Sequence, residues 1–214
     1  MPRRFNSEEE TRILETLHAA GRANIGSRGV RKTTVEELAR AAGIAKGSFY
    51  RFYASKEELA LTLLAEWERG FHDAVESRFH SSKPRGAEKT AEVLLEIFLS
   101  DFPAQVAASG MQGLFHPDEI AYLQQRADSD HLQVMDDQDI RLFDRLTPLL
   151  RSAGLKPAAD SPVVIAALRL LFDAALSLLS DPTQRESTIT TEHTRSALKA
   201  LIHGSLLVLF RSVR

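Results

Sequence analysis

Apolar residues recur every three or four positions along most of the chain, which is the spacing of one face of an α-helix. In the first sixty residues, three helix starts carry the capping-box pattern, in which a Ser or Thr is followed three residues later by Glu. The pairs are Ser7 with Glu10, Thr34 with Glu37, and Ser55 with Glu58. The pattern therefore predicts a first helix that ends near residue 27, a short helix over 35–42 and a long helix over 56–80.

Helical spacing continues through the rest of the chain, with breaks at proline and glycine. The expected helices cover residues 87–102, 132–153, 161–179 and 191–210. The first of these is predicted to stop at Pro103, and residues 104–130 are less regular. Because no alternating run of β-branched residues and no internal repeat is present, the sequence predicts an all-α fold.

The stretch EELARAAGIAKGSFYRFY, residues 36–53, interrupts this pattern after only about two helical turns. Gly43 supplies the left-handed conformation that turns the chain, and Ile44 is the apolar residue of the turn. A second short helix is expected over 46–53. Two short helices joined by such a turn form a helix-turn-helix, whose second helix can enter the major groove of DNA.

Positions on that second helix follow from a rotation of 100° per residue. Phe49 and Tyr53 fall on one side and are expected to face the core. The outward residues are Lys46, Gly47, Ser48, Tyr50 and Arg51. Cations, hydroxyls and a residue without a side chain suit a phosphate-lined groove, and Arg51 could form a bidentate contact with guanine. A short solvated helix that is basic by chance explains the same pattern, so the face alone does not decide.

Composition excludes several classes of site. The chain has 214 residues, 43% of them hydrophobic, and no cysteine, so disulfides, thiolate chemistry and Cys-based zinc sites are excluded. The basic N-terminus has no apolar stretch behind it, so no signal peptide is expected. The most apolar run, residues 162–179, contains Arg169 and Asp173, which disfavours a membrane span. A cytoplasmic location without a membrane is therefore expected.

Charge is distributed unevenly along the chain. Residues 1–60 hold 11 Lys and Arg against 8 Asp and Glu, a net charge of +3. The remainder holds 16 against 21, a net charge of −5. A basic N-terminal part on an acidic body suggests that only the first part meets a polyanion.

The stretch RKTTVEELARAAGIAKGSFYRFYASKEEL, residues 31–59, resembles the DNA-binding domain of the TetR family of transcriptional regulators. The Thr-Thr-Val start, the Ala-Gly-Ile turn and the Lys-Gly-Ser and Ser-Lys-Glu triplets fall at the family's spacing without gaps. The resemblance implies a homodimer of subunits with about nine helices. Each subunit would have a three-helix helix-turn-helix head, residues 1–54, and an α-helical ligand-binding and dimerisation body, residues 55–214.

The resemblance also implies DNA contacts at particular residues, most of them to the backbone. These are Thr34, Lys46, Gly47, Ser48, Tyr50 and Lys56, to which the helical geometry adds Arg51. Ala45 departs from the family, because a Ser or Thr usually opens this helix, and the change loses an N-cap of about 1 kcal/mol. Phe52 departs as well, because it cannot donate to a phosphate where Tyr or His is usual. Tyr53 is expected to place its hydroxyl at the edge of the core.

A helical body of this kind invites a pocket for a small apolar ligand. The candidate lining residues are Trp67, Phe71, Phe98, Phe102, Met111, Phe115, His116, Phe143 and Leu146, with His116 as the polar anchor. Each of the apolar residues is equally explained by core packing at helical spacing. The acidic run over 128–139 could hold a divalent cation or could simply favour a helix N-terminus, and without a known ligand spacing no metal or cofactor is expected.

The two C-terminal helices are too broadly apolar to be covered by one neighbour, which predicts a two-fold packing of two subunits. The residues assigned to that interface are Val164, Leu168, Leu171, Leu178, Leu198 and Leu206. The expected function is therefore a dimeric repressor that a small ligand releases from a near-palindromic DNA operator. A regulator whose body binds a protein partner is the alternative. No nucleophile elbow, P-loop or dinucleotide fingerprint is present, so an enzyme is not expected.

Overall fold

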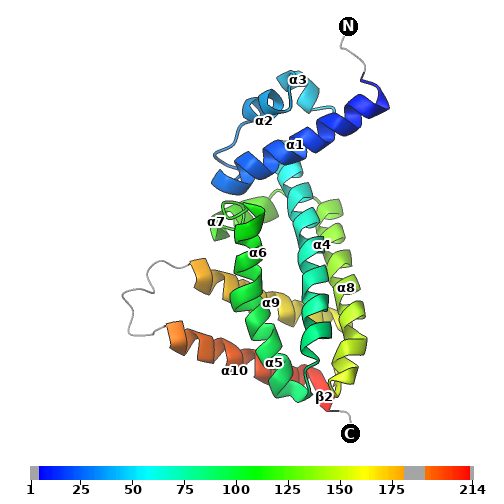
Figure 1. The fold of residues 1–214 in the computed structure, drawn as a ribbon, viewed down its shortest axis with the longest axis vertical. Coiled ribbons are helices and arrows are strands. Elements are labelled where there is room, and N and C mark those ends of the chain that lie inside the picture. Colours follow the sequence, from blue (N-terminus) through cyan, green and yellow to red (C-terminus); the bar gives the residue numbers. More distant parts are fainter. Residues whose placement is uncertain (1–4, 181–190, 213–214) are drawn as a thin grey trace. The chain divides into compact units, whose positions relative to one another are not determined.

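The computed structural model describes residues 5–180 and 191–212, and most of these residues are helical (Figure 1). The helices are α1 (Ser7–Arg28), α2 (Val35–Ala41), α3 (Lys46–Phe49), α4 (Lys56–Ser82), α5 (Gly86–Glu96), the π-helix η1 (Ile97–Asp101), α6 (Phe102–Ser109), α7 (Pro117–Gln124), α8 (Ser129–Ser152), α9 (Ser161–Ser180) and α10 (Thr191–Leu209). This architecture confirms the predicted all-α fold. No helix among the described residues is long and apolar enough to cross a membrane.

The described residues group into two compact units whose borders fall inside helices. Unit 1 contains the chain through Glu68 together with Val106–Leu132, and unit 2 contains Arg69–Gln105 and the chain from Gln133 onward. Both units are therefore discontinuous in sequence, whereas the domains predicted from the sequence, 1–54 and 55–214, are continuous. The functional border at residue 54 stays a prediction.

Unit 1 is built around apolar residues of α1–α4 and the α6–α7 segment. Its largest fully buried side chains are Leu17, Ile25, Leu38, Phe49, Leu59, Leu63, Met111, Leu114 and Leu123. α1 and α4 approach closely at Gly21, where an added Cβ would lie 2.6 Å from a methyl of Leu63. Phe49 and Tyr53 are both buried, which confirms that this side of the second helix faces the core.

Two predicted helix ends lie elsewhere in the structure. The capping box of α1 is formed by Asn6 and Glu9, one residue before the predicted pair, because the Asn6 side chain accepts from the Glu9 amide at 2.8 Å. α3 ends at Phe49 rather than at Tyr53. The amide of Arg51 bonds to Ser48 and that of Phe52 to Phe49, so the chain leaves the helix through a tighter, 3₁₀-like turn.

The expectation that a helix stops at Pro103 is wrong, because α5, η1 and α6 follow one another without a break. Proline normally interrupts a helix because its ring meets the carbonyl group four residues earlier, here that of Leu99. Leu99 lies in η1, where the Phe102 amide bonds back to Ile97 across five residues. This wider turn accommodates the proline, so the helical direction continues to Ser109.

Unit 2 packs α10 against α5 and α9, and α9 against η1. Unit 2 also contains a short antiparallel pair of strands, β1 (Leu155–Pro157) and β2 (Phe210–Ser212). Lys156 lies opposite Arg211 in this pair. Leu155 of β1 and Phe210 of β2 are buried. The sequence did not predict the strands because three residues are too few to establish an alternating pattern.

Candidate nucleic-acid interface

The turn between α2 and α3 has the geometry expected of a helix-turn-helix. Gly43 has a φ of 69°, in the left-handed region, and an added Cβ would meet no other atom there. The next amide, that of Ile44, bonds back to the carbonyl of Ala39 at 3.0 Å. Glycine is therefore required at this turn for its backbone conformation rather than for space.

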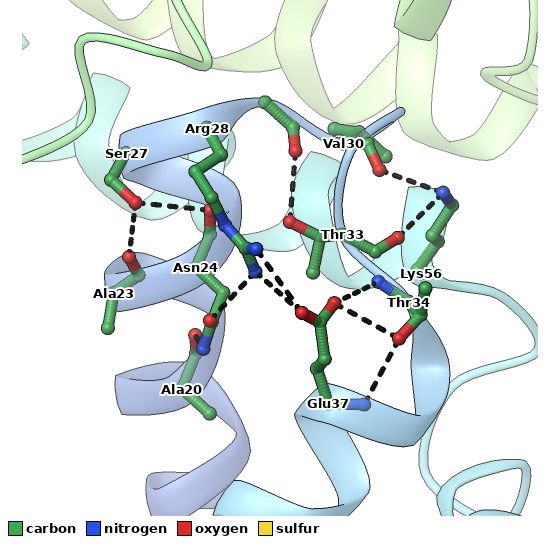
Figure 2. Close-up of polar contacts among 11 residues, drawn as sticks. Ala20, Ala23, Asn24, Ser27, Arg28, Val30, Thr33, Thr34, Glu37 and Lys56 are labelled. Carbon is green, nitrogen blue, oxygen red and sulfur yellow. Dashed lines mark hydrogen bonds and ion pairs between the residues drawn. The ribbon is translucent and has the colours of Figure 1, made fainter.

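The first turn of α2 is fixed by a polar network around Glu37 (Figure 2). Thr34 caps the helix, and its amide and hydroxyl donate to the Glu37 carboxylate at 2.8 and 3.0 Å. Arg28, at the end of α1, donates to the other oxygen of Glu37 at 3.2 Å. The hydrogen bonds from Thr34 and Arg28 hold the pKa of Glu37 below its ordinary value. The predicted capping box of Thr34 and Glu37 is confirmed, and Arg28 is a member that the sequence analysis missed.

Lys56 has a structural role in addition to the DNA contact predicted for it. Its ammonium group donates to the carbonyls of Val30 and Thr33, each at 2.8 Å, as Figure 2 shows. An ammonium group has three N–H donors, so these two bonds leave one for a phosphate. Lys56 therefore fixes the loop that leads into α2.

The outward face of α3 presents the residues assigned to it. Gly47 has open space around its Cα, and the side chain of Tyr50 is 51% exposed. Lys46 pairs with Glu36 at 2.9 Å, and the hydrogen bond and charge of Glu36 raise the pKa of Lys46. Such exposed ion pairs contribute little to stability, so a DNA phosphate can replace the carboxylate at small cost.

Arg51 and Phe52 have partners near the N-terminus that the sequence did not indicate. Arg51 bonds to Glu10 at 3.1 Å, and its guanidinium group lies 4.8 Å from the ring centre of Phe5. The ring of Phe52 lies 6.0 Å from that of Phe5. Phe52 therefore packs where a phosphate donor was expected. Ala45 makes no side-chain capping bond to α3, as its sequence predicted.

Tyr53 closes the core of unit 1 through its hydroxyl group. The hydroxyl lies 2.5 Å from Nε2 of His18, whose Nδ1 lies 3.0 Å from Glu66. Burial, followed by the charges of Glu66 and Glu58, raises the pKa of Tyr53 to about 12. The tyrosine thus has its ring in the core and its polar end in a network at the edge, as predicted.

The residues assigned to a ligand pocket divide between the two units. Trp67, Met111, Phe115 and His116 belong to unit 1, and Phe71, Phe98, Phe102 and Phe143 belong to unit 2. In unit 1, the rings of Trp67 and Phe115 pack with centres 4.4 Å apart. His116 is a poor anchor for an apolar pocket, because its side chain is 60% exposed ahead of α7 and lies 4.0 Å from Asp118.

Unit 2 contains an aromatic cluster whose central residue, Phe172, was not assigned from the sequence. The ring of Phe172 packs against Phe102 at 4.7 Å, Phe98 at 5.9 Å and Phe71 at 6.4 Å. Gln138 on α8 is 4% exposed, and neither polar atom of its amide has a hydrogen-bond partner among the described residues. A buried amide without partners is costly, so Gln138 is a candidate to bind a ligand or a water molecule.

Gln138 is followed on α8 by a residue that contacts the helices carrying Phe71 and Phe172. The next residue, Asp139, pairs with Arg169, which precedes Phe172 by about one helical turn. Asp139 also lies 3.5 Å from His72, the residue after Phe71. Asp136 pairs with Arg169 as well, so these acids have a protein cation as partner. No group of acids and histidines within the described ranges is arranged to hold a metal ion.

The residues assigned to the dimer interface are mostly inside the subunit. Val164, Leu171, Leu198 and Leu206 are buried in unit 2, Leu168 is half-buried, and the side chain of Leu178 lies outside what the structure describes. The four buried side chains cannot supply contact area to a second subunit. Among the side chains of α9 and α10 that the structure describes, the exposed large apolar residues are Val163, Leu170, Leu201, Leu207 and Val208.

Comparison with known proteins agrees with this geometry. The model of a family described as bacterial regulatory proteins, tetR family, matches residues 17–63, which span the last part of α1 through the first turns of α4. The transcriptional repressor KstR2 of Mycobacterium tuberculosis is 29% identical over 167 residues, 78% of this chain and 80% of the repressor. KstR2 of Rhodococcus jostii is 32% identical over 96 residues, 45% of this chain and 44% of that repressor.

Solved structures of low sequence identity share the fold. RolR in complex with resorcinol superposes with a TM-score of 0.60 at 15% identity and covers 98% of this chain and 92% of its own. A TetR-family transcriptional regulator from Streptomyces coelicolor gives 0.54 at 16% identity over 92% and 99% of the two chains. The match of residues 17–63 to the family model and the similarity to the KstR2 repressors support a DNA-binding transcription regulator rather than an enzyme. The match to the tetR family of bacterial regulatory proteins thus covers the helix-turn-helix part of the chain.

Proposed function

We propose that the protein is a homodimeric repressor that leaves a near-palindromic operator when a small, largely apolar effector binds unit 2. The observation that supports DNA binding is the exposed face formed by Lys46, Gly47 and Tyr50. It belongs to a helix-turn-helix in which Thr34 caps α2 and Lys56 holds the preceding loop. The KstR2 relatives are named repressors, which favours repression over activation here. DNA contacts are assigned to Thr34, Lys46, Gly47, Ser48, Tyr50 and Arg51, with Lys56 contributing its remaining donor.

A second copy of the chain is the proposed partner of the exposed apolar face of α9 and α10. Val163 and Leu170 are seven residues apart, as are Leu201 and Val208, so each pair lies on one face of its helix. Leu170 is 70% exposed and Val208 is 78% exposed. A patch of this kind marks an interface, and a two-fold pairing would place two heads on two half-sites.

The proposed effector site combines the Phe172 cluster with Gln138. The rings offer apolar and stacking contacts, and the amide of Gln138 can both donate and accept a hydrogen bond. The matching ligand is an apolar molecule of ring-like shape that carries one group able to do the same, such as a hydroxyl or carboxyl group. An effector acts by binding more tightly to the conformation that does not fit the operator.

DNA binding is tested by fluorescence anisotropy with duplexes from the region upstream of the protein's own gene. Tyr50→Ala and Arg51→Ala are expected to weaken specific binding about tenfold each, because each loses a contact to the backbone or a base. Arg141→Ala is the matched control, since it removes an exposed arginine from unit 2. If wild-type protein binds none of these duplexes more tightly than unrelated DNA, the proposed operator near its own gene is refuted.

Dimerisation is tested by light scattering coupled to gel filtration. A Leu170→Glu, Val208→Glu double variant is expected to run as a monomer, because charges would be buried in the interface. Ile140→Glu, at an exposed apolar residue of α8, is the control and is expected to remain a dimer. A double variant that keeps the wild-type mass would place the interface elsewhere.

A further inference from the structure

Glu119 on α7 is a buried acid that belongs to unit 1 and that no sequence motif indicated. It is only 5% exposed. One carboxylate oxygen accepts hydrogen bonds from the amides of Val30 and Arg31, at 2.7 and 3.3 Å. The other accepts from Nε of Arg31 at 2.6 Å. A carboxylate carried by α7 therefore binds the loop between α1 and α2 through both its backbone and its cation.

Glycines allow the chain to approach Glu119 and the segment around it. Gly29 has a φ of 88°, and an added Cβ would lie 2.7 Å from the carboxyl carbon of Glu119. The Gly113 amide donates to the Gly26 carbonyl at 2.6 Å, and an added Cβ on Gly113 would lie 2.6 Å from the carbonyl carbon of Ser27. The segment that carries Glu119 thus packs directly on the backbone of the last turn of α1.

The loop that Glu119 binds leads directly to the DNA-contact end of α2. Lys56 holds the carbonyls of Val30 and Thr33, while Glu119 holds the amides of Val30 and Arg31. The hydroxyl of Thr33 also donates to the Gly29 carbonyl at 3.0 Å. The carboxylate of Glu119 therefore binds amides of this short loop, and the ammonium group of Lys56 binds its carbonyls. The next residue, Thr34, caps α2.

We propose that Glu119 is a positioning residue for DNA binding, which holds the loop over 29–33 so that Thr34 and the first turn of α2 meet the operator backbone in the correct place. Without the hydrogen bonds from its amides to Glu119, this short loop would adopt several conformations. Each DNA-binding event would then include the cost of ordering it. The inference rests on the DNA-binding function and does not depend on the effector.

A purely electrostatic role for Glu119 predicts the opposite result. Arg31 is near the DNA-contact surface, and its guanidinium group is neutralised by Glu119 and lies 3.9 Å from Asp118. If Glu119 served only to mask this cation, its removal would free Arg31 and strengthen binding to every DNA sequence. If Glu119 positions the loop, its removal weakens binding to the operator.

The two roles are separated by anisotropy on full-length protein with two probes. One is a duplex selected by the wild-type protein from a random pool, and the other is an unrelated duplex of equal length. Glu119→Gln and Glu119→Ala are expected to weaken binding to the selected duplex about tenfold, the effect of losing one charged hydrogen bond. Asp118→Asn, which also removes a negative charge near Arg31 but contacts no loop amide, is expected to stay within about twofold. Unchanged or tighter binding of the selected duplex by both Glu119 variants overturns the proposal.

A double-mutant cycle distinguishes positioning from a general loss of stability. Thr34→Ala removes the cap through which Glu119 is proposed to act, so Glu119→Gln is expected to cost less than about twofold in that background. Equal costs in both backgrounds would refute a role through α2. Hydrogen exchange at the Val30 and Arg31 amides is expected to accelerate in Glu119→Gln at unchanged circular dichroism, and unchanged exchange would also refute it.

Discussion

Among the described residues the two units differ at one buried polar side chain, because only unit 2 contains one without a hydrogen-bond partner. In unit 1, Glu119 and Thr33 have hydrogen-bond partners, and these bonds converge on the loop that leads to α2. In unit 2, Gln138 is as deeply buried and has no partner for either amide atom among the described residues. A satisfied buried network specifies one geometry, whereas an unsatisfied group favours any ligand that completes it. Unit 1 is therefore suited to present a fixed surface, and unit 2 to respond to a bound molecule.

The largest effects are expected from substitutions at the end of α3, where one residue stabilises the fold and its neighbour is proposed to contact DNA. Phe49 is fully buried and Tyr50 beside it is half exposed. Phe49→Ala is expected to lower the free energy of unfolding by about 3–5 kcal/mol and to abolish DNA binding with it. Tyr50→Ala is expected to change stability by less than about 0.5 kcal/mol while still weakening DNA binding. Urea unfolding and anisotropy on both variants check the difference, and equal destabilisation would contradict the assignment of the two faces.

The parts of this contrast that the sequence predicted are the local ones. The cap of Thr34 by Glu37 and the turn at Gly43 involve residues close in the chain, so residue type and spacing indicate them. Glu119 and Val30 are 89 positions apart, and their bond depends on how α7 packs on α1. The only local signal is the glycines at 26, 29, 110 and 113. They permit a close approach of two backbone segments, but they do not indicate which segments meet.

The residues assigned to the dimer interface and to the ligand pocket were harder to predict, for equally specific reasons. α9 is apolar on more than one face, so periodicity could not decide which leucines face the subunit's own core and which face outward. Gln138 resembles an ordinary surface residue in sequence, because its burial depends on tertiary packing, which residue type and spacing do not reveal. His116 was chosen as a polar anchor for its residue type, but its position before α7 leaves it exposed.

The next largest effect on stability is expected at Gln138, the buried amide of unit 2 without a hydrogen-bond partner among the described residues. Gln138→Leu is expected to raise the free energy of unfolding by about 1–3 kcal/mol, because the variant no longer buries an amide without partners. Gln133→Leu, at an exposed position of the same helix, is the control and is expected to change stability by less than about 0.5 kcal/mol. Thermal and urea unfolding provide the measurement. A destabilised Gln138→Leu protein would mean that the amide already has partners in solution.

The units are also expected to lose stability in different ranges of pH. Burial, opposed by the charge of Asp139, lowers the pKa of His72 in unit 2 from its ordinary 6.5. Below that value the unfolded chain binds a proton that the folded chain does not, so the His72 contribution falls as pH falls through 6.5. Burial alone would raise the pKa of Glu119, but the bonds from Arg31 and Val30 outweigh it and hold the pKa below 4.5. Its contribution is therefore complete above 4.5 and is lost only at lower pH.

This difference is measured by urea unfolding between about pH 3.5 and pH 8, a range that brackets both ordinary pKa values. His72→Gln is expected to flatten the curve near pH 6, and Glu119→Gln is expected to flatten it only below pH 4.5. The same flattening in both variants would contradict the assignment of separate ranges to the two groups.

The smallest effect is expected at Ala45, whose side chain cannot accept a hydrogen bond from the first amides of α3. The amides at the start of α3 receive no side-chain cap from Ala45. Ala45→Ser is expected to raise the free energy of unfolding by about 1 kcal/mol and to add a hydroxyl that can reach a phosphate. Ala45→Gly is the control, because glycine also suits the capping position but brings no hydroxyl group. Tighter operator binding by the serine variant alone assigns the gain to a phosphate contact. An equal gain in both variants would assign it to the helix start, because only the backbone conformation of that start is common to them.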